Sequence, residues 1–518
     1  MPSKDLLDQF NLTRNPFTDR TAEKTNLDQT STYCHSDLQG FAPSETTYIF
    51  FGRRGSGKTT IRMQMQKAYE EYNESAKHHG SHGHFVADLC RPGHMTACLR
   101  AFQSAVGCND DNWDAQFGDA WTSADMVDCI LSFAATSIVA RLTDPTAGEE
   151  GKIMLSRVRS DPRAAKQLLL LAHLYARTDS ASLATLRREL LPLQYSNTQI
   201  GLGLVATASV AAGVGAAANS PDVADAVAAP FEALWDEVGR GAPALHNHPR
   251  ITFAATAAAA GAAVWYYRRY ARQRNYARAV QLISCVRVVK QQPPELMASL
   301  LSRLFNPQDR VDTIRSLCIG ISAHQKLDLL TSLVRLLGFE SVAVFGDCFD
   351  EVSLLDPVQY PGAIKAFAKE VCRNDLLNFG RLHFFFPDSR LSLDLNTDKT
   401  LKEARFDRHF VRDLTWSRFQ LEQLAERRFI AAQRPSGSAA GTMEASANGP
   451  GKGPTAFSSL FEKVRVEDFS SYLAKLSTPR ELMIMMTEIL ARMEAHPDKS
   501  LEAQDMEIAV TKALEQAV

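Results

Sequence analysis

Residues 52–60 have the types and the spacing of a loop that binds phosphate. They read GRRGSGKTT and fit the pattern G-x-x-x-x-G-K-[ST]. In such a loop the glycines let backbone N–H groups close on phosphate oxygens, and the following helix adds the positive end of its dipole. Lys58 would reach the β- and γ-phosphates, and the Thr59 hydroxyl would bind Mg²⁺. The pattern therefore predicts a nucleoside triphosphate site formed by Gly52, Arg53, Arg54, Gly55, Ser56, Gly57, Lys58, Thr59 and Thr60.

A second group of residues, 341–351, would supply the acid that a nucleotide-bound Mg²⁺ needs. Its sequence, SVAVFGDCFDE, begins with an apolar run that predicts a buried parallel strand. Asp347 follows at the carboxyl end of that strand, where its carboxylate would hold Mg²⁺ through water. Asp350 and Glu351 come next and would position or deprotonate the attacking water. The alternative is an ordinary strand followed by an acidic turn.

Both groups need strands and helices to position them, and the sequence predicts these elements. The apolar residues 48–51 predict a strand that leads into the glycine-rich loop, and residues 61–72 predict the helix that follows it. Residues 327–337 predict a helix that Gly338 would terminate, just before the strand that carries the acids. Residues 381–386, RLHFFF, predict a further core strand. The expected fold class is α/β, a P-loop NTPase core whose parallel sheet is flanked by helices.

The composition is that of a globular protein and excludes several other classes. The 518 residues include 57 Lys and Arg against 59 Asp and Glu, a formal charge of −2. Such a balance argues against a nucleic-acid partner, for which a basic excess is typical. The nine cysteines form no CxxC pair and fit a reducing compartment. Residues 1–14 are polar and lack the apolar stretch of a signal peptide.

Two uncharged segments, residues 200–218 and 251–267, have the length of membrane spans. As helices they would extend roughly 28 and 25 Å, against about 30 Å of bilayer hydrocarbon. The loop between them is acidic and arginines flank both outer ends, so the positive-inside rule places both termini in the cytosol. We therefore predict a two-helix transmembrane hairpin, with the NTPase core in the cytosol. The alternative is a buried hairpin in a cytoplasmic protein, because both segments are rich in Ala and Gly.

These features predict an order of regions along the chain. We expect residues 1–108 to form the first half of the NTPase core, 109–197 a helical insertion, 198–270 the hairpin with its acidic loop, 271–340 a helical return segment, 341–433 the second half of the core, 434–455 a flexible low-complexity insert and 456–518 a helical lid. The leucine spacing of three and four residues supports the helical insertion, and the small residues of 434–455 support the flexible insert.

The motifs together resemble a known superfamily. The acids Asp347, Asp350 and Glu351 are similar to the extended Walker B motif of STAND-type NTPases and of the broader AAA+ class. Residues 15–17, NPF, resemble a segment found before the P-loop in many bacterial-type AAA ATPases. A membrane hairpin between the Walker A and Walker B motifs looks like that of the KAP family of P-loop NTPases. KAP proteins typically read DDxDR at Walker B, whereas this chain reads DCFDE.

The resemblance implies ATP rather than GTP, and Mg²⁺-dependent hydrolysis that drives a conformational change. Arg480, at the start of a predicted helix over 481–493, resembles the lid arginine called sensor 2; the alternative is a structural role. Residues 412–428 look like the helix that follows the sensor strand in these ATPases. A polar sensor would come from Asp388, Ser389 or Arg390. Arg408 and Arg412 would supply a charge to the γ-phosphate, in cis or from another subunit of a homo-oligomer; the alternative for these two arginines is a solvated helix face.

Three functions remain open at this point. The first is an ATPase whose cycle moves an unidentified protein partner at a membrane. The second is a STAND-type switch that holds nucleotide without hydrolysing it and serves as a scaffold. The third is a soluble AAA-like ATPase whose alanine-rich hairpin packs on protein. A GTPase is less favoured, because the NKxD signature that reads guanine is absent from the sequence.

Overall fold

The computed structural model describes most of the chain, in two compact units. The described residues are 4–19, 38, 41–144, 148–191, 249–290, 292–306, 308–387, 410–433, 456–461, 469–496 and 501–517, and the side chains of 4–6, 249–264, 267, 374 and 375 are not included. One unit comprises Met1–Phe133 and Gly338–Val518, and the other comprises Ala134–Leu337.

Several predictions concern residues outside this part of the chain. They are the first apolar segment (200–218), the low-complexity insert (434–455), and the sensor and arginine candidates Asp388, Ser389, Arg390 and Arg408.

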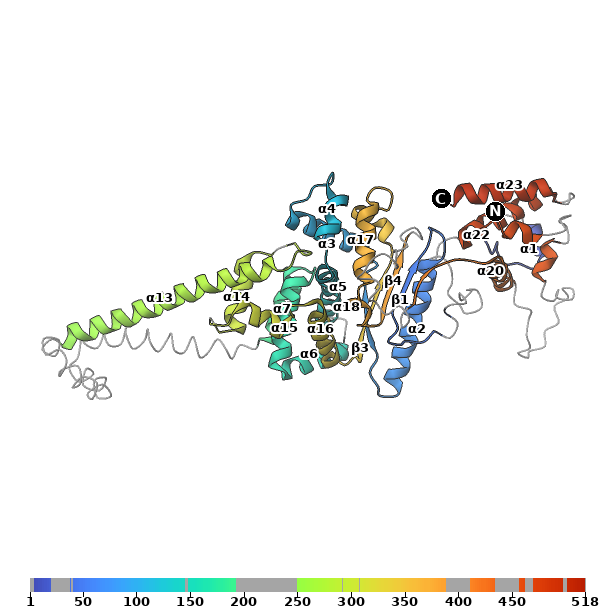
Figure 1. Ribbon diagram of the computed structural model, residues 1–518. Helices are drawn as coiled ribbons and strands as arrows, with labels where there is room; N and C mark the ends of the chain where they lie inside the picture. Colours follow the sequence, from blue (N-terminus) through green and yellow to red (C-terminus); the bar gives the residue numbers. More distant parts are fainter. Residues whose placement is uncertain are drawn as a thin grey trace. The chain divides into compact units, whose positions relative to one another are not determined.

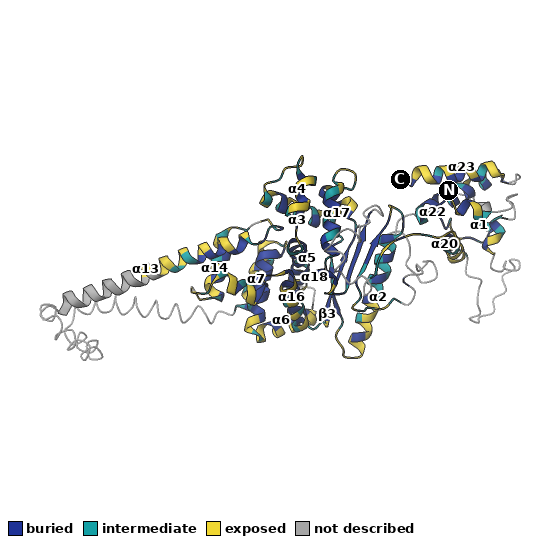
Figure 2. Cartoon of the chain, viewed as in Figure 1, coloured by how far each residue is buried: buried dark blue, intermediate teal, exposed yellow. Residues whose placement is uncertain are grey.

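The first unit is built on a five-stranded parallel sheet, which confirms the α/β class (Figure 1). Its strand order is β2-β3-β4-β1-β5, and every pairing is parallel. The strands are β1 (Tyr48–Phe51), β2 (His84–Asp88), β3 (Ser341–Gly346), β4 (Leu382–Phe386) and β5 (Phe410–Asp413). All residues of β3 and β4 are buried, as continuous apolar runs in a parallel sheet require (Figure 2).

Helices cover both faces of this sheet. On one face, α2 (Lys58–His78) packs Ile61, Met65 and Tyr69 against Phe50 and Phe385. On the other face lie α3 (Pro92–Val106), α4 (Trp113–Ala120) and α17 (Pro361–Val371). The alternation of strand side chains explains the division, because neighbouring residues point to opposite faces.

Aromatic rings hold the central strands in register. The rings of Phe50 and Phe385 stack at 5.4 Å on one face, and those of Phe51 and Phe386 stack at 5.3 Å on the other. His383 of β4 is fully buried, and its Nε2 lies 3.0 Å from the Tyr69 hydroxyl. Burial favours the neutral imidazole and lowers the pKa of His383 to about 3. The strand between β1 and β3 therefore carries an uncharged imidazole in the buried core.

A helical part of the same unit joins the two ends of the chain. It contains α1 (Lys4–Gln9), α20 (Arg418–Ala431), α21 (Phe469–Leu473), α22 (Pro479–Ala495) and α23 (Ala503–Gln516). Its core includes Phe17, Phe429, Leu482 and Met506. The helix expected over 481–493 is confirmed as α22, which begins at a capping box between Thr478 and Glu481.

The helix expected over 412–428 begins later than predicted, and this expectation is corrected. Arg412 belongs to strand β5, which ends at Asp413, and α20 starts at Arg418. Ser417 fixes that start, because its side chain accepts from the Gln420 N–H while the Gln420 side chain accepts from the Ser417 N–H. The guanidinium of Arg412 lies 4.3 Å from the ring of Phe410 on the same strand.

The second unit consists of helices among its described residues. They are α6 (Gly148–Ser160), α7 (Pro162–Tyr175), α8 (Ser180–Leu190), α13 (Pro249–Ser284), α14 (Pro294–Leu304), α15 (Val311–Cys318) and α16 (Ala323–Leu337), and α5 (Ser123–Thr143) enters the unit at Ala134. Nearly every residue of α7 is buried, so it forms the centre of this unit. Gly338 follows α16 with a φ of +104°, the left-handed turn predicted for the end of that helix.

The structure bears on the predicted hairpin only through its second segment. Residues 251–267 lie inside α13, a helix of 36 residues. Among the residues that the structure describes, only α5 is long and apolar enough to cross a membrane, and 72% of its apolar window is buried within the protein. Such burial is also typical of a core helix. The two-helix hairpin therefore stays a prediction.

Candidate functional site

The two predicted motifs lie at the same edge of the sheet. Because all five strands are parallel, the loop after β1 and the loop after β3 both leave from the carboxyl ends of their strands. From β1 the chain crosses past β4 and β3 to β2, whereas from β4 it crosses past β1 to β5. The connections thus run in opposite directions from neighbouring strands, and ligands of open parallel sheets bind at such a switch point.

The loop after β1 has the backbone shape that its glycines permit. Gly55 and Gly57 adopt φ values of +84° and +89°, in the left-handed region. A Cβ on Gly55 would also lie 2.6 Å from the Cβ of Arg480, so no larger residue fits there without a shift. Gly57 caps helix α2, whose first residue is Lys58. The loop therefore ends at a helix N-terminus, as the motif predicts.

Lys58 lies across its own loop. Its side chain is buried, and Nζ donates to the carbonyl oxygens of Gly52 at 2.8 Å and Arg53 at 3.1 Å. Burial lowers the pKa of Lys58, and the negative charges of Asp347 and Asp350 oppose this effect. The ammonium group has a third hydrogen that these two carbonyls do not use. Arg53 and Arg54 are exposed at the tip of the loop.

Asp347 is buried and forms an ion pair that the sequence analysis did not foresee. Its Oδ2 accepts from Nε of Arg62 at 3.1 Å, and the two side chains are 3% and 13% exposed. Arg62 lies four residues after Lys58, on the same side of α2. That spacing was the available signal, since i and i+4 residues of a helix point in one direction. Arg62 also donates to Oε1 of Gln66 at 2.9 Å.

The residues after Asp347 turn sharply toward the surface. Cys348 adopts a φ of +61°, a backbone conformation that costs energy for a residue with a side chain. Such strained residues are found at functional sites. Phe349 is buried against Phe386, with ring centroids 5.3 Å apart. This anchor leaves Asp350 and Glu351 exposed at the edge of the sheet. Burial raises the pKa of the Cys348 thiol to about 12, so it remains neutral beside these acids.

Two residues of the C-terminal helical part contact the glycine-rich loop. The indole Nε1 of Trp416 donates to the Ser56 carbonyl at 2.8 Å, and the Arg480 N–H donates to the Gly55 carbonyl at 3.3 Å. The structure thus brings Arg480 beside the loop, and its charge contributes to lowering the pKa of Lys58. The role of the Trp416 indole was not predicted from the sequence, in which residues 412–428 were expected to form one helix.

The residues at this edge fit a nucleotide with Mg²⁺. The Ser56 hydroxyl is buried and has no hydrogen-bond partner among the residues that the structure describes. Thr59 and Asp347 offer hydroxyl and carboxylate oxygens, the ligands that Mg²⁺ prefers. No group of three or more His, Cys, Asp or Glu occurs as a metal cluster in the described part of the chain. Mg²⁺ bound with a nucleotide needs none, because phosphates and waters complete its shell.

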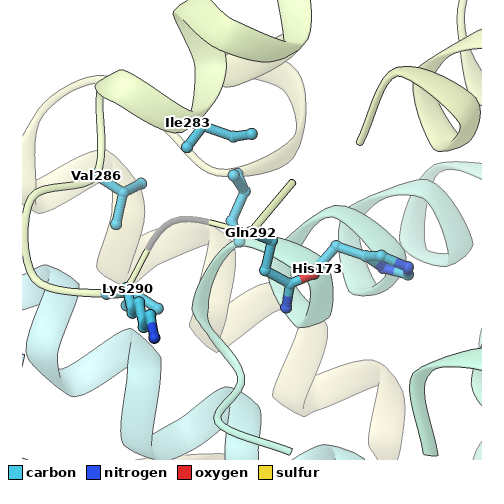
Figure 3. Close-up of a pocket in the computed structure, with 7 residues that line it drawn as sticks. His173, Ile283, Val286, Lys290 and Gln292 are labelled. Carbon is cyan, nitrogen blue, oxygen red and sulfur yellow. The ribbon is translucent and has the colours of Figure 1, made fainter. Parts of the chain in front are cut away.

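A pocket in the second unit does not compete with this site. It is lined by His173, Leu174, Ile283, Val286, Val289, Lys290 and Gln292 (Figure 3). Its cavity volume is about 10 Å³, room for about one water molecule, against the roughly 300–1,000 Å³ of most small-molecule sites. None of the residues predicted to bind nucleotide or metal belongs to it.

The chain matches no protein-family model, no curated protein and no solved structure. The function must therefore be inferred from the residues of the site and from their geometry.

Proposed function

We propose that the protein binds ATP with Mg²⁺ at the glycine-rich loop and hydrolyses it. The observation that carries the proposal is the buried Lys58 at the N-terminus of α2, held over a left-handed glycine loop beside the buried acid Asp347. This combination brings together a phosphate-binding cation and a metal-binding acid at the edge of the sheet where ligands bind. The resemblance to the AAA+ and STAND classes favours ATP over GTP.

Each residue then has a chemical role. Backbone N–H groups of the loop and the Lys58 ammonium would hold the β- and γ-phosphates, and Asp347 and Thr59 would hold Mg²⁺. Bound Mg²⁺ neutralises the charge that develops on the phosphates during transfer. Asp350 or Glu351, both exposed at the rim, would orient the attacking water or take its proton.

The contacts of Arg480 and Trp416 with the glycine-rich loop favour a conformational role for the nucleotide. Arg480 and Trp416 bond to carbonyls of the loop that would close on the phosphates. Nucleotide and lid would therefore share one loop, so binding would bias the position of the lid. This contact also supports the second candidate, a STAND-type switch that holds ATP or ADP without turnover and acts on an unidentified protein partner.

The experiment that tests the proposal is single-turnover ATP hydrolysis by the purified chain. We expect turnover by the wild type and its loss in Lys58→Ala and in the double variant Asp350→Asn, Glu351→Gln. Lys67→Ala is the matched control, because Lys67 lies on the same helix but is exposed. Binding that depends on Lys58, without turnover by the wild type, would favour the switch. Turnover retained in Lys58→Ala would reject the proposed site.

A membrane location is a separate part of the proposal. Helix α13 continues without a break from the apolar residues 251–264 into a stretch of aromatic and basic residues. In that stretch Trp265 and Tyr266 are 60% and 68% exposed, and the Arg269 guanidinium lies 5.3 Å from the Trp265 ring. Aromatic and basic residues beside an apolar helix are typical of a membrane interface.

Carbonate extraction of membranes tests this location. Retention of the full chain in the pellet would support the predicted membrane hairpin. Release into the supernatant would reject it and favour a cytoplasmic AAA-like ATPase. Either result leaves the assignment of the nucleotide site unchanged, because none of the residues of that site belongs to the hairpin.

A further inference from the structure

The ion pair between Arg62 and Asp347 joins the two motifs of the site. The carboxylate of Asp347 is 3% exposed, so its charge requires a partner within the protein. Arg62 supplies that partner at 3.1 Å. An arginine in this position would compete with any other cation for Asp347, because the Oδ2 that accepts from Arg62 belongs to the carboxylate assigned to Mg²⁺.

Helix α2 carries both cations of the site. Lys58 begins the helix and Arg62 follows one turn later, while Thr59 lies between them. The helix that would bind the phosphates therefore also neutralises Asp347, the acid that follows β3. The residue that would bind phosphate and the residue that neutralises Asp347 are therefore about one turn apart on the same helix.

Arg62 has other polar surroundings to which it can turn. Its Nη1 donates to Oε1 of Gln66 at 2.9 Å, and the carboxylate of Asp88, at the end of β2, adds a negative charge close enough to favour the charged guanidinium. The arginine would thus keep a hydrogen bond and a nearby acid after leaving Asp347. Displacement from Asp347 therefore leaves the positive charge of Arg62 partly compensated.

We propose that Arg62 is a resident counter-ion that neutralises Asp347 until Mg²⁺ arrives with the nucleotide and displaces it. The inference depends on the proposed function and adds a regulatory property to the same site. It makes Arg62 a positioning residue that competes with Mg²⁺ for one carboxylate. The concentration of Mg²⁺ that the site requires is then set partly by the strength of the ion pair.

A Mg²⁺ titration of nucleotide binding tests the competition. The probe is a fluorescent ATP analogue, bound to the full chain at increasing Mg²⁺ after treatment with a chelator. For Arg62→Gln, the Mg²⁺ concentration at half-maximal binding should fall at least about tenfold, the effect of losing one charged hydrogen bond. Arg62→Lys should stay near the wild type, because it restores a competing positive charge. Lys67→Gln removes a charge from the exposed side of α2 and should cause no shift.

Three outcomes of this Mg²⁺ titration would overturn the proposal. One is an unchanged or higher Mg²⁺ requirement in Arg62→Gln, which would mean that the arginine supports metal binding or has no effect on it. Another is an equal shift in Lys67→Gln, which would indicate a general effect of charge. A wild type that binds no analogue would reject the proposed function, and the role of Arg62 with it.

A double-variant cycle covers the case in which Arg62→Gln is unstable. Urea unfolding without Mg²⁺ is compared for the wild type, Arg62→Gln, Asp347→Asn and the double variant. If the two residues interact, Asp347→Asn should shift the unfolding midpoint of the Arg62→Gln protein by less than half as much as it shifts that of the wild type. Additive shifts would show that the two residues do not interact in the metal-free protein and would overturn the proposal.

Discussion

The loop after β1 and the loop after β3 lie at one edge of the sheet, yet they stabilise their buried charges differently. The first buries a positive charge, that of Lys58, and satisfies it with backbone carbonyls of the same loop. The second buries a negative charge, that of Asp347, and neutralises it with a side chain from another element, Arg62. The first is therefore a local arrangement, whereas the second depends on the packing of α2 against the sheet.

The difference predicts where the site is sensitive. A loop held by its own backbone depends on glycine conformation and on the residues that touch it. A loop held by an ion pair depends on two distant positions, and removal of either one leaves a buried charge. Substitutions at the second loop should therefore cost more stability than those at the first.

The largest effect should follow Asp347→Ala in the second loop. The substitution removes the ion-pair partner of Arg62 in a largely buried place, while Gln66 and the charge of Asp88 stay close to the guanidinium. We therefore expect a loss of about 3 kcal/mol of unfolding free energy, the low end for a broken buried pair. Urea unfolding without Mg²⁺ measures it. Asp350→Ala is the control, since Asp350 is exposed and its loss should stay within about 0.5 kcal/mol. Equal effects of the two substitutions would break the comparison.

Gly55→Ala tests the first loop. A left-handed φ costs a non-glycine residue about 1–2 kcal/mol, and the new Cβ adds overpacking of about 1 kcal/mol or more. That Cβ would lie 2.6 Å from the Cβ of Arg480. Gly80→Ala is the matched control, because Gly80 has a φ of +68° but its added Cβ would meet no described atom within 4 Å. We expect Gly55→Ala to lower the unfolding free energy more than Gly80→Ala; equal losses would mean that Arg480 does not restrict the loop.

His383→Gln tests the strand that lies between β1 and β3. Above the ordinary histidine pKa of about 6.5, the neutral imidazole is present in both states and adds no pH dependence. As pH falls below that value the unfolded chain takes up a proton that the folded protein, with a pKa of about 3, refuses. Between pH 7 and pH 5 the wild type should thus lose about 2 kcal/mol of stability through this group.

Urea unfolding at several pH values measures this loss. In His383→Gln it should disappear, while the glutamine can still accept from Tyr69. His78→Gln, at the exposed end of α2, serves as the control and should keep the acid sensitivity of the wild type. Unchanged acid sensitivity in His383→Gln would mean that the imidazole does not oppose protonation.

The smallest effect should follow Trp416→Phe, which removes one hydrogen bond to the first loop. The lost bond from Nε1 to the Ser56 carbonyl is worth about 1 kcal/mol. Trp265→Phe, at a tryptophan that is 60% exposed, should change stability by less than about 0.5 kcal/mol. Identical values would show that the Trp416 indole does not support the loop.

The sequence predicted the first loop well, because its structure follows from neighbouring residues. The strand expected over 48–51 is β1, and the glycines at 55 and 57 adopt the left-handed backbone that only glycine favours. The strand before Asp347 could be predicted equally well, because a short apolar run follows Gly338. In both places the local pattern and the final structure agree.

The remaining features depend on contacts between distant residues, for which one sequence holds little signal. Arg62 is an ordinary helical residue until β3 brings Asp347 beside it. The residues around Trp113 have the same helical pattern as the insertion that follows. In the structure, however, the Trp113 indole belongs to the first unit and donates to the Leu354 carbonyl at 2.9 Å. Strand β5 has the same length as β1 but ends in the exposed residues Arg412 and Asp413, so it lacks the buried apolar run that made β1 recognisable. Only its pairing with β1 in the fold shows that it is a strand.

The central claim is that the loop at residues 52–60 binds a nucleoside triphosphate through Lys58. Calorimetric titration of the full chain with ATP and Mg²⁺ tests it most directly, beside Lys58→Ala and the control Lys67→Ala. We predict binding by the wild type and the control, and an affinity between about tenfold and a hundredfold weaker in Lys58→Ala. Equal affinity in all three proteins, or no binding by the wild type, would contradict the claim.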